Sequence, residues 1–385
     1  MYPYGPWFPL RQVPRPRDSR RILVLNPDVD PRDYFKRMVK EHGAVLVRYL
    51  PSINAISCYL PARSVLLSLR GRPEVSRIDY DLELRIATYS RPRVATVSGQ
   101  ELPWGVERVR APQAWPATKG TDVRIGVIDT GVDLSHPDLQ GNVAGGFNVL
   151  ASDQPPLDDN GHGTHVAGTI AALNNDFGVV GVAPEAKLYA VKAFDADGTA
   201  RVSDVIAGME WCVANQVRLI NFSFGSESGN ESLRDAVRAV ARHAILVAAA
   251  GNNGRADSVD VPARYPEVVA VAASTRGDQL ASFTSRGPQV AVAAPGQEIT
   301  STWLDGGYST LSGTSMATPH VTALFALLMR LHPGLTRAQL LEVVRSTADP
   351  LIGVSEDGGA GIVNAANAVS AIGGGRSSPA FGRWG

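Results

Sequence analysis

The sequence predicts an α/β protein whose larger part is a mostly parallel, doubly wound sheet with helices on both faces. Five apolar runs of strand length alternate with helical stretches from about residue 99 onward. Apolar residues make up 44% of the 385-residue chain and charged residues only 19%, which is typical of a well-buried core. Strands that are apolar on both sides indicate a parallel sheet covered by helices on each face.

A smaller α+β unit is expected before this domain, because strand and helix periodicities follow each other there in a different order. The order β-α-β-β-α-β is that of a split βαβ fold. Its expected strands are 21–26, 44–50, 55–60 and 75–86, and its expected helices are 31–42 and 62–69. The unit has no cluster of histidine, aspartate and serine, so its sequence suggests binding rather than chemistry.

The larger domain supplies the remaining elements. Its expected strands are 123–130, 187–194, 217–224, 244–251 and 268–274. Its expected helices are 162–173, 202–215, 232–243, 315–331 and 336–348. Functional groups of such sheets lie at the carboxyl ends of the strands.

Composition defines the outer segments of the chain and excludes several function classes. The expected division is a flexible segment 1–20, the small unit 21–86, an exposed polar connector 87–98, the large domain 99–372 and a Gly/Ser-rich tail 373–385. The formal charge is zero without a long basic run, so neither nucleic acid nor an anionic membrane is an expected partner. The two cysteines, Cys58 and Cys212, are too few for a disulfide framework.

In the stretch Gly313–His320, small and hydroxyl residues precede an expected helix that is apolar on all sides. Such a helix belongs in the protein interior, and it is too short and alanine-rich for a membrane span. Thr314 is expected to cap it. Ser315 then lies in the first turn, where free N–H groups and the helix dipole stabilise negative charge. Ser315 is thus a candidate nucleophile, although a second capping serine would give the same pattern.

Three further residues follow strands or open helices at the same edge of the sheet. Asp129 ends an apolar strand and needs a polar partner, or it caps the following turn. His162 lies between glycines at a helix start and is a candidate base, with a packed structural histidine as the alternative. The spacing of His162 and His165 is not that of a zinc helix. Asn252 follows a strand and offers an uncharged amide donor for an oxyanion, or belongs to an ordinary turn.

Three blocks of these residues carry a resemblance to a known family. Asp129-Thr130-Gly131, His162-Gly163-Thr164-His165 and Gly313–Pro319 look like the signature blocks of the subtilisin-like serine proteases, in the same order along the chain. The similarity runs from about Gln100 to Ala371. The unit 21–86 resembles the family's propeptide, which folds the enzyme and inhibits it.

The resemblance implies a calcium-binding serine endopeptidase that is made as a self-processed precursor. Ser315 would be the nucleophile, His162 the general base and then acid, and Asp129 the group that orients the imidazole. Asn252 would donate to the oxyanion. Expected partners are protein or peptide substrates and the protein's own propeptide, and a monomer is expected. The match of Gln100 favours a mature start near residue 99.

The resemblance also assigns a substrate groove. Ser223, Phe224 and Gly225 match the segment that pairs with an extended substrate backbone, and Gly251 and Asn160 belong to the same groove. Backbone pairing of this type tolerates many sequences, so broad specificity is expected. Phe224, with no charged residue evident in these segments, suggests a preference for apolar or aromatic side chains.

The family's high-affinity calcium site is the last implication for residues. The loop 173–179 interrupts a helical stretch and matches this site. An all-oxygen set with a single carboxylate suits calcium. The implied ligands are the side chains of Gln100, Asp138 and Asn175 and the carbonyls of Leu173, Phe177 and Val179.

Two matters stay open from the sequence. Relatives of this kind are mostly exported, but residues 1–17 show no apolar signal segment, so secretion is expected by resemblance and an intracellular location is the alternative. A catalytically inactive relative that only binds peptides would share the same motifs. A phosphate-binding enzyme is disfavoured because the chain lacks a Gly-x-x-x-x-Gly-Lys loop.

Overall fold

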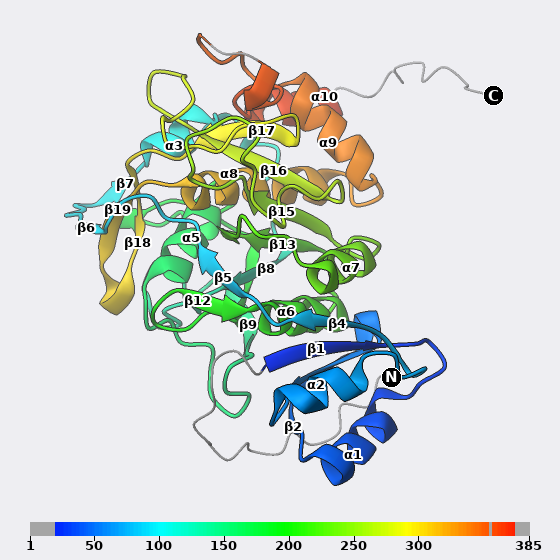
Figure 1. The fold of residues 1–385 in the computed structure, drawn as a ribbon. Coiled ribbons are helices and arrows are strands. Elements are labelled where there is room, and N and C mark those ends of the chain that lie inside the picture. The colour runs from blue at the N-terminus through cyan, green and yellow to red at the C-terminus, as the bar shows by residue number, and fades with distance from the viewer. Residues whose placement is uncertain (1–19, 354–355, 374–385) are drawn as a thin grey trace.

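A computed structural model describes residues 20–353 and 356–373 of the chain. The expected flexible N-terminal segment and nearly all of the expected tail lie outside the described residues. The expected α/β fold class is confirmed, and Figure 1 shows the elements in order.

The centre of the larger domain is a seven-stranded sheet in which all neighbouring strands are parallel. Residues along a strand face two different apolar cores, one on each side of the sheet. In β8 (Arg124–Asp129), for example, Ile125 and Val127 belong to one apolar cluster and Ile128 belongs to the other. In spatial order the strands are β17 (Val290–Pro295), β16 (Val268–Ser274), β15 (Ile245–Ala249), β13 (Leu219–Phe222), β8 (Arg124–Asp129), β11 (Lys187–Lys192) and β9 (Val143–Asn148).

Helices cover both faces of this sheet (Figure 1). On one face α5 (His162–Ala171) packs against α8 (Thr314–Leu331), and on the other α6 (Val202–Ala214) packs against α7 (Glu231–Val240). Shorter helices complete the domain: α3 (Trp104–Arg108), α4 (Ala111–Ala114), α9 (Arg337–Ser346) and α10 (Ala365–Gly373). In the described part of the chain, no helix is long and apolar enough to cross a membrane.

Helix α8 is buried along most of its length. Every residue from Thr314 to Leu328 is buried. The expectation that Thr314 caps this helix was wrong. Gly313 holds the cap position without a side-chain cap, because the Thr314 hydroxyl donates to Asn252 instead.

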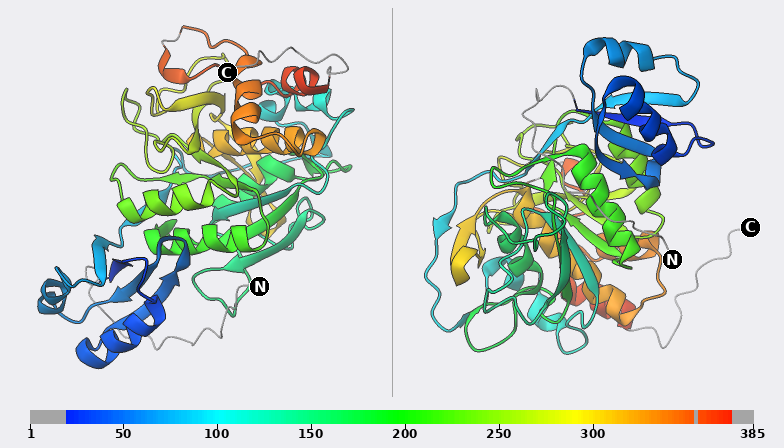
Figure 2. Two further views of the ribbon diagram at one scale, coloured as in Figure 1. Left: turned by 90° about the vertical axis from the view of Figure 1, so that its right-hand side faces the viewer. Right: turned by 90° about the horizontal axis from the view of Figure 1, so that it is seen from below.

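The N-terminal unit has the order β-α-β-β-α-β, with an antiparallel sheet in the order β2-β3-β1-β4 and its own apolar core. It lies against α6 and α7, where both Figure 1 and Figure 2 place it. Its elements are β1 (Arg20–Leu25), α1 (Pro31–His42), β2 (Val45–Leu50), β3 (Ala55–Tyr59), α2 (Arg63–Leu69) and β4 (Val75–Tyr80).

The strand expected at 75–86 is two strands in the structure. The chain leaves the N-terminal sheet after β4 and forms β5 (Glu83–Ile86), which lies between β12 (Thr199–Arg201) and β14 (Phe224–Gly225) of the larger domain. Continuous β-type residues hide this break in the sequence. The partner strand changes because residues 81 and 82 carry the chain from one domain to the other.

The connector after β5 was expected to be exposed, but parts of it are buried or paired with the larger domain. Ala87 is buried, and β6 (Arg93–Val94) pairs with β19 (Tyr308–Leu311), which also pairs with β18 (Ile299–Thr302). Beyond it, β7 (Gln100–Glu101) pairs with β10 (Gly178–Val179). Helix α5 ends at Ala171, so the loop 173–179 follows this helix and does not interrupt it.

Buried ion pairs join the N-terminal unit to the first turn of α6. Arg48 donates to Asp204 at 2.5 Å, and Arg20 lies 2.8 Å from the same carboxylate and 2.6 Å from Asp81. Burial alone would raise the pKa of Asp204, but Arg48 and Arg20 hold it below its usual value. The interface therefore depends on a carboxylate that must stay ionised.

We expect Asp204→Asn to lower the free energy of unfolding of the full chain by about 3 kcal/mol, because it leaves two buried guanidinium groups without their shared counterion. Urea unfolding of the Ser315→Ala protein checks this. The stability that Asp204 contributes is present at neutral pH and is lost as the pH falls through its lowered pKa. Asp235→Asn, which breaks a one-third exposed pair with Arg77, should lose at most about 1 kcal/mol. Equal losses in the two variants would contradict the argument.

Candidate active site

Asp129 and His162 meet at the carboxyl edge of the sheet. Asp129 ends β8, His162 opens α5, and His162 Nδ1 lies 2.7 Å from Asp129 Oδ1 with both side chains buried. This close approach needs a glycine beside the histidine, because a Cβ on Gly163 would lie 2.1 Å from the Gly131 carbonyl oxygen. The sequence signal around His162 is therefore a packing requirement.

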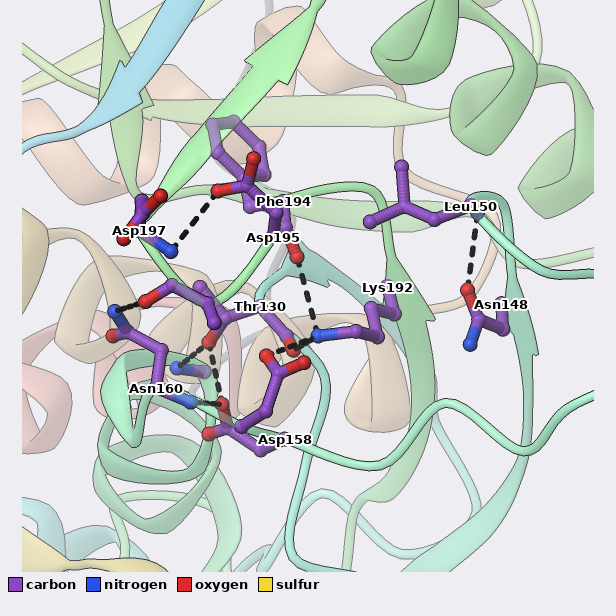
Figure 3. A network of polar contacts seen from close by, with 12 residues as sticks. Thr130, Asn148, Leu150, Asp158, Asn160, Lys192, Phe194, Asp195 and Asp197 are labelled. Atoms are coloured by element: carbon purple, nitrogen blue, oxygen red, sulfur yellow. Dashed lines mark hydrogen bonds and ion pairs between the residues drawn. The ribbon is translucent and has the colours of Figure 1, made fainter. Parts of the chain in front are cut away.

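A second aspartate, Asp158, fixes the first turn of α5 (Figure 3). Its carboxylate accepts from Thr130 Oγ1 at 2.8 Å and from the Thr164 hydroxyl at 2.6 Å. Lys192 Nζ donates to the Thr130 carbonyl at 2.6 Å and to Asp159 at 2.5 Å. These groups hold the chain on both sides of Asp129 and His162. Sequence reasoning missed Asp158, although an aspartate shortly before a helix start is a recognisable capping signal.

Ser315 lies in the first turn of α8, and two hydrogen bonds link it to Ser223. Ser315 Oγ donates to the Ser223 carbonyl at 2.7 Å, and Ser223 Oγ donates to the Ser315 carbonyl at 2.9 Å. That carbonyl is free to accept because Pro319, four residues on, has no N–H group. The Ser315 hydroxyl does not donate to His162, whose buried Nε2 has no hydrogen-bond partner in the described part of the chain. A buried acceptor without a donor is uncommon, and a hydroxyl is the donor type it lacks.

Two donors from different elements converge on the carbonyl oxygen of Ala87. Asn252 Nδ2 donates to it at 2.6 Å and the Ser315 backbone N–H at 3.3 Å. The amide of Asn252 is held in this orientation by Thr314, whose N–H and hydroxyl both donate to Asn252 Oδ1 at 3.0 Å. Fixed donors on a carbonyl oxygen are the arrangement that stabilises an oxyanion.

The chain before Ala87 occupies a groove as an extended strand. Residues 83–86 pair with β12 on one side and β14 on the other, and the Ala87 N–H donates to the Ser223 carbonyl at 3.1 Å. Asn160 does not hydrogen bond to this strand in the described chain. Its amide donates to the Ala196 carbonyl at 2.8 Å, and its Oδ1 accepts from the His162 N–H at 3.2 Å.

Phe224 contributes only its backbone to the groove. Its side chain is fully buried and packs against Phe194 and Phe222, with ring centroids 4.8 and 5.2 Å apart. A Cβ added at Gly225 or at Gly251 would lie 2.8 or 2.5 Å from the side chain of Asp260, a residue outside the segments considered from the sequence. The side chain of Phe224 therefore does not support the expected apolar preference, because it faces the core.

Oxygens of the expected metal set gather around the amide of Gln100. Its Nε2 donates to the Leu173 carbonyl at 2.9 Å, to Asn175 Oδ1 at 3.1 Å and to the Phe177 carbonyl at 3.2 Å. Oxygens that converge on one point could hold a hard cation if the amide presented its oxygen to them.

Asp138 lies beside this cluster. Its carboxylate accepts from Asn175 Nδ2 at 3.1 Å and from the Val179 N–H at 2.8 Å, and burial raises its pKa. Val179 thus takes part through its N–H group. Among the described residues, no group of three or more His, Cys, Asp or Glu side chains could hold a metal.

Comparison with known proteins identifies the family. Residues 120–372 match the subtilase family. The chain is 40% identical over 335 residues to subtilisin E of Bacillus subtilis, covering 86% of this chain and 84% of that protein. It is also 40% identical over 353 residues to a thermostable alkaline protease of Halalkalibacterium halodurans, covering 91% and 92%, and over 313 residues to the M-protease of Shouchella clausii, covering 80% and 78%.

Both the extent of these matches and the arrangement at the sheet edge lead to one conclusion, and the sequence-based prediction of an endopeptidase is confirmed. The chain belongs to the subtilase family of serine endopeptidases.

Proposed function

We propose that Ser315, His162 and Asp129 form the catalytic triad of this endopeptidase and that Asn252 and the Ser315 N–H form its oxyanion hole. The observation that carries the proposal is the Ala87 carbonyl, which accepts from both donors at 2.6 and 3.3 Å directly beside the Ser315 side chain. A peptide carbonyl held in this way is polarised toward attack by the serine.

The proposed reaction has two halves. Ser315 Oγ attacks the carbonyl carbon while its proton moves to His162 Nε2, and Asp129 stabilises the imidazolium through Nδ1. Asn252 and the Ser315 N–H hold the negative oxygen of the tetrahedral intermediate. Collapse breaks the C–N bond, and His162 gives its proton to the leaving amine. Water, deprotonated by His162, then releases the acyl group from Ser315 by the same steps.

We propose that the chain is a self-inhibited precursor and that its first cleaved bond is Ala87–Thr88. Strand β5 fills the groove, and the side chain of Leu84 is buried in the core beside α6 and α7. This position replaces the start near residue 99 that the sequence favoured. The N-terminal unit would stay bound after cleavage, because its ion pairs with Asp204 and the pairing of β5 do not involve the cleaved bond.

We further propose that the oxygen cluster around Gln100 and Asp138 binds calcium. The convergence of three oxygens on one amide group and the nearby buried carboxylate support this set. Calcium would tie the chain that follows the connector to the loop 173–179. The family resemblance supports action outside the cell, which fractionation of the native cells tests.

Replacing the nucleophile tests the triad and self-processing together. We expect Ser315→Ala to remain uncut and to hydrolyse no peptide, since the attacking oxygen is gone. The wild-type chain should yield a new N-terminus at Thr88, read by intact-mass spectrometry. Processing of purified Ser315→Ala would contradict self-cleavage. Failure of a serine-directed phosphonate to label the processed wild type would favour the inactive relative.

The oxyanion donor gives a second prediction. We expect Asn252→Ala to lower kcat by about 10²- to 10³-fold with little change in KM, because the lost hydrogen bond strengthens only in the transition state. Steady-state kinetics on a peptide substrate measures both constants. Asn215→Ala, which removes a surface side chain bonded to the Trp211 carbonyl, is the matched control. A loss confined to KM would contradict the assignment.

Calcium gives a third prediction. We expect calcium to raise the Tm of the processed enzyme, and we expect Asp138→Asn to remove most of this shift, because the set then has no charge to oppose the cation. Differential scanning fluorimetry with and without EGTA measures it. Asp176→Asn changes an exposed carboxylate of the same loop and should keep the shift. An equal shift in both variants would contradict the site.

A further inference from the structure

Asp260 lies where the two backbone segments of the substrate groove come together. Its N–H donates to the Ala250 carbonyl at 2.8 Å, and the next residue, Val261, exchanges hydrogen bonds with Ser226 at 2.9 and 3.0 Å. Backbone hydrogen bonds of Asp260 and Val261 therefore join this part of the chain to the segment after β15 and to the segment after β14. Both segments lie beside Ala87: its N–H donates to Ser223, just before β14, and its carbonyl accepts from Asn252, shortly after β15.

Glycines on both segments make room for the Asp260 side chain. A Cβ on Gly225 would lie 2.8 Å from Asp260 Cβ and 3.1 Å from Oδ2. A Cβ on Gly251 would lie 2.5 Å from Oδ2, and the φ of +108° there is one that L side chains rarely adopt. The carboxylate thus lies directly against the backbone of both segments, and its Oδ2 faces the gap between them.

The charge of Asp260 has no ion-pair partner among residues 20–353 and 356–373. The residue is only 9% exposed, yet in the described part of the chain its carboxylate forms no ion pair. Its one hydrogen bond there comes from Asn253 Nδ2 to Oδ1 at 3.3 Å. Arg264, the nearest cation along the chain, donates to the Glu227 carbonyl at 3.4 Å. Burial, followed by the charge of Glu227, raises the pKa of Asp260 to about 6.

A buried carboxylate without a counterion is unfavourable unless a ligand supplies the charge. Ala87 shows where such a ligand would lie, because its N–H donates to the Ser223 carbonyl and its own carbonyl accepts from Asn252. The residue at this position lies between the segments that carry Gly225 and Gly251. A long side chain there would run along the two glycines toward Asp260 Oδ2.

We propose that Asp260 forms the floor of the pocket for the residue on the N-terminal side of the cleaved bond, and that it selects lysine or arginine there. The proposal rests on the site assigned above. A purely structural Asp260 would use both carboxylate oxygens to hold its own loop, as Asp158 does at the start of α5. Asp260 leaves Oδ2 free on the side of the two glycines.

The alanine in the protein's own sequence does not oppose this specificity. Residue 87 is presented to Ser315 within the same chain, and β5 is already paired on both sides. An intramolecular cleavage gains its rate from this positioning and needs no contact in the pocket. Substrates cut in a second molecule lack that advantage, so there the carboxylate decides between them.

The test uses the self-processed enzyme and a peptide series that differs only in the residue before the cleaved bond: lysine, arginine, norleucine and phenylalanine. We expect kcat/KM for the basic peptides to exceed that for norleucine by about 10- to 100-fold, the range of a hydrogen-bonded charge pair. Asp260→Asn should bring this ratio of kcat/KM values close to one, and Asp260→Glu should largely retain the preference for basic peptides. Asp257→Asn, an exposed carboxylate of the same loop, should leave the ratio unchanged.

The pH dependence provides a check that does not depend on a variant. Since the pKa of Asp260 is about 6, the preference for lysine over norleucine should be full above that pH and should shrink as the pH falls through it. A wild type that prefers phenylalanine or norleucine, or a lysine-to-norleucine ratio that Asp260→Asn leaves unchanged, would overturn the proposal. Phosphonate labelling separates the outcomes: a labelled enzyme without basic preference refutes only the role of Asp260, whereas no labelling and no turnover refute the active site itself.

Discussion

The structure depends on one constraint, the fixed position of the Ala87 carbonyl oxygen between Asn252 and the first turn of α8. Neither donor can be moved alone. The Asn252 amide is held by Thr314, and Thr314 belongs to a helix whose residues are buried as far as Leu328. A polar group at the end of a close-packed helix is positioned by the whole core, since such interiors resist small displacements. The all-apolar helix therefore gives the site its rigidity.

Glycine is required at the two places where a carboxylate at this sheet edge lies against neighbouring backbone. The backbones approach each other at Gly163 and Gly131 beside the histidine, and the side chain of Asp260 approaches the backbone at Gly225 and Gly251. In the first case the missing Cβ lets one buried carboxylate, Asp129, reach its histidine. In the second it lets another carboxylate lie against the groove. Two aspartates at one sheet edge thus have opposite environments, because one has a partner inside the protein and the other has not.

Local sequence patterns predicted five of the seven strands of the sheet and the residues that end them, since apolar runs and helix starts depend on near neighbours. They did not predict β17 or β9, whose two glycines weaken its strand pattern, and they did not predict the break between β4 and β5. The sequence offered Asp129, His162, Asn252 and Ser315 as candidates because each stands at or beside an element boundary. Asp260 was missed because it reaches the groove only through pairing of Val261 with Ser226, a contact that no local pattern encodes.

The proposed self-cleavage and the proposed substrate choice depend on different contacts. In the proposed precursor, residue 87 would be aligned by the paired strand β5 and by the ion pairs at Asp204, and neither set of contacts includes Asp260. The proposed role of Asp260 in specificity would therefore not hinder the proposed self-cleavage. An alanine at position 87 has a further consequence: the N-terminal strand, while it stays bound in the groove, offers no cation to Asp260. If Asp260 acts as proposed, a basic substrate side chain would gain an ionic contact that the bound strand lacks, and it would compete for the groove through that contact.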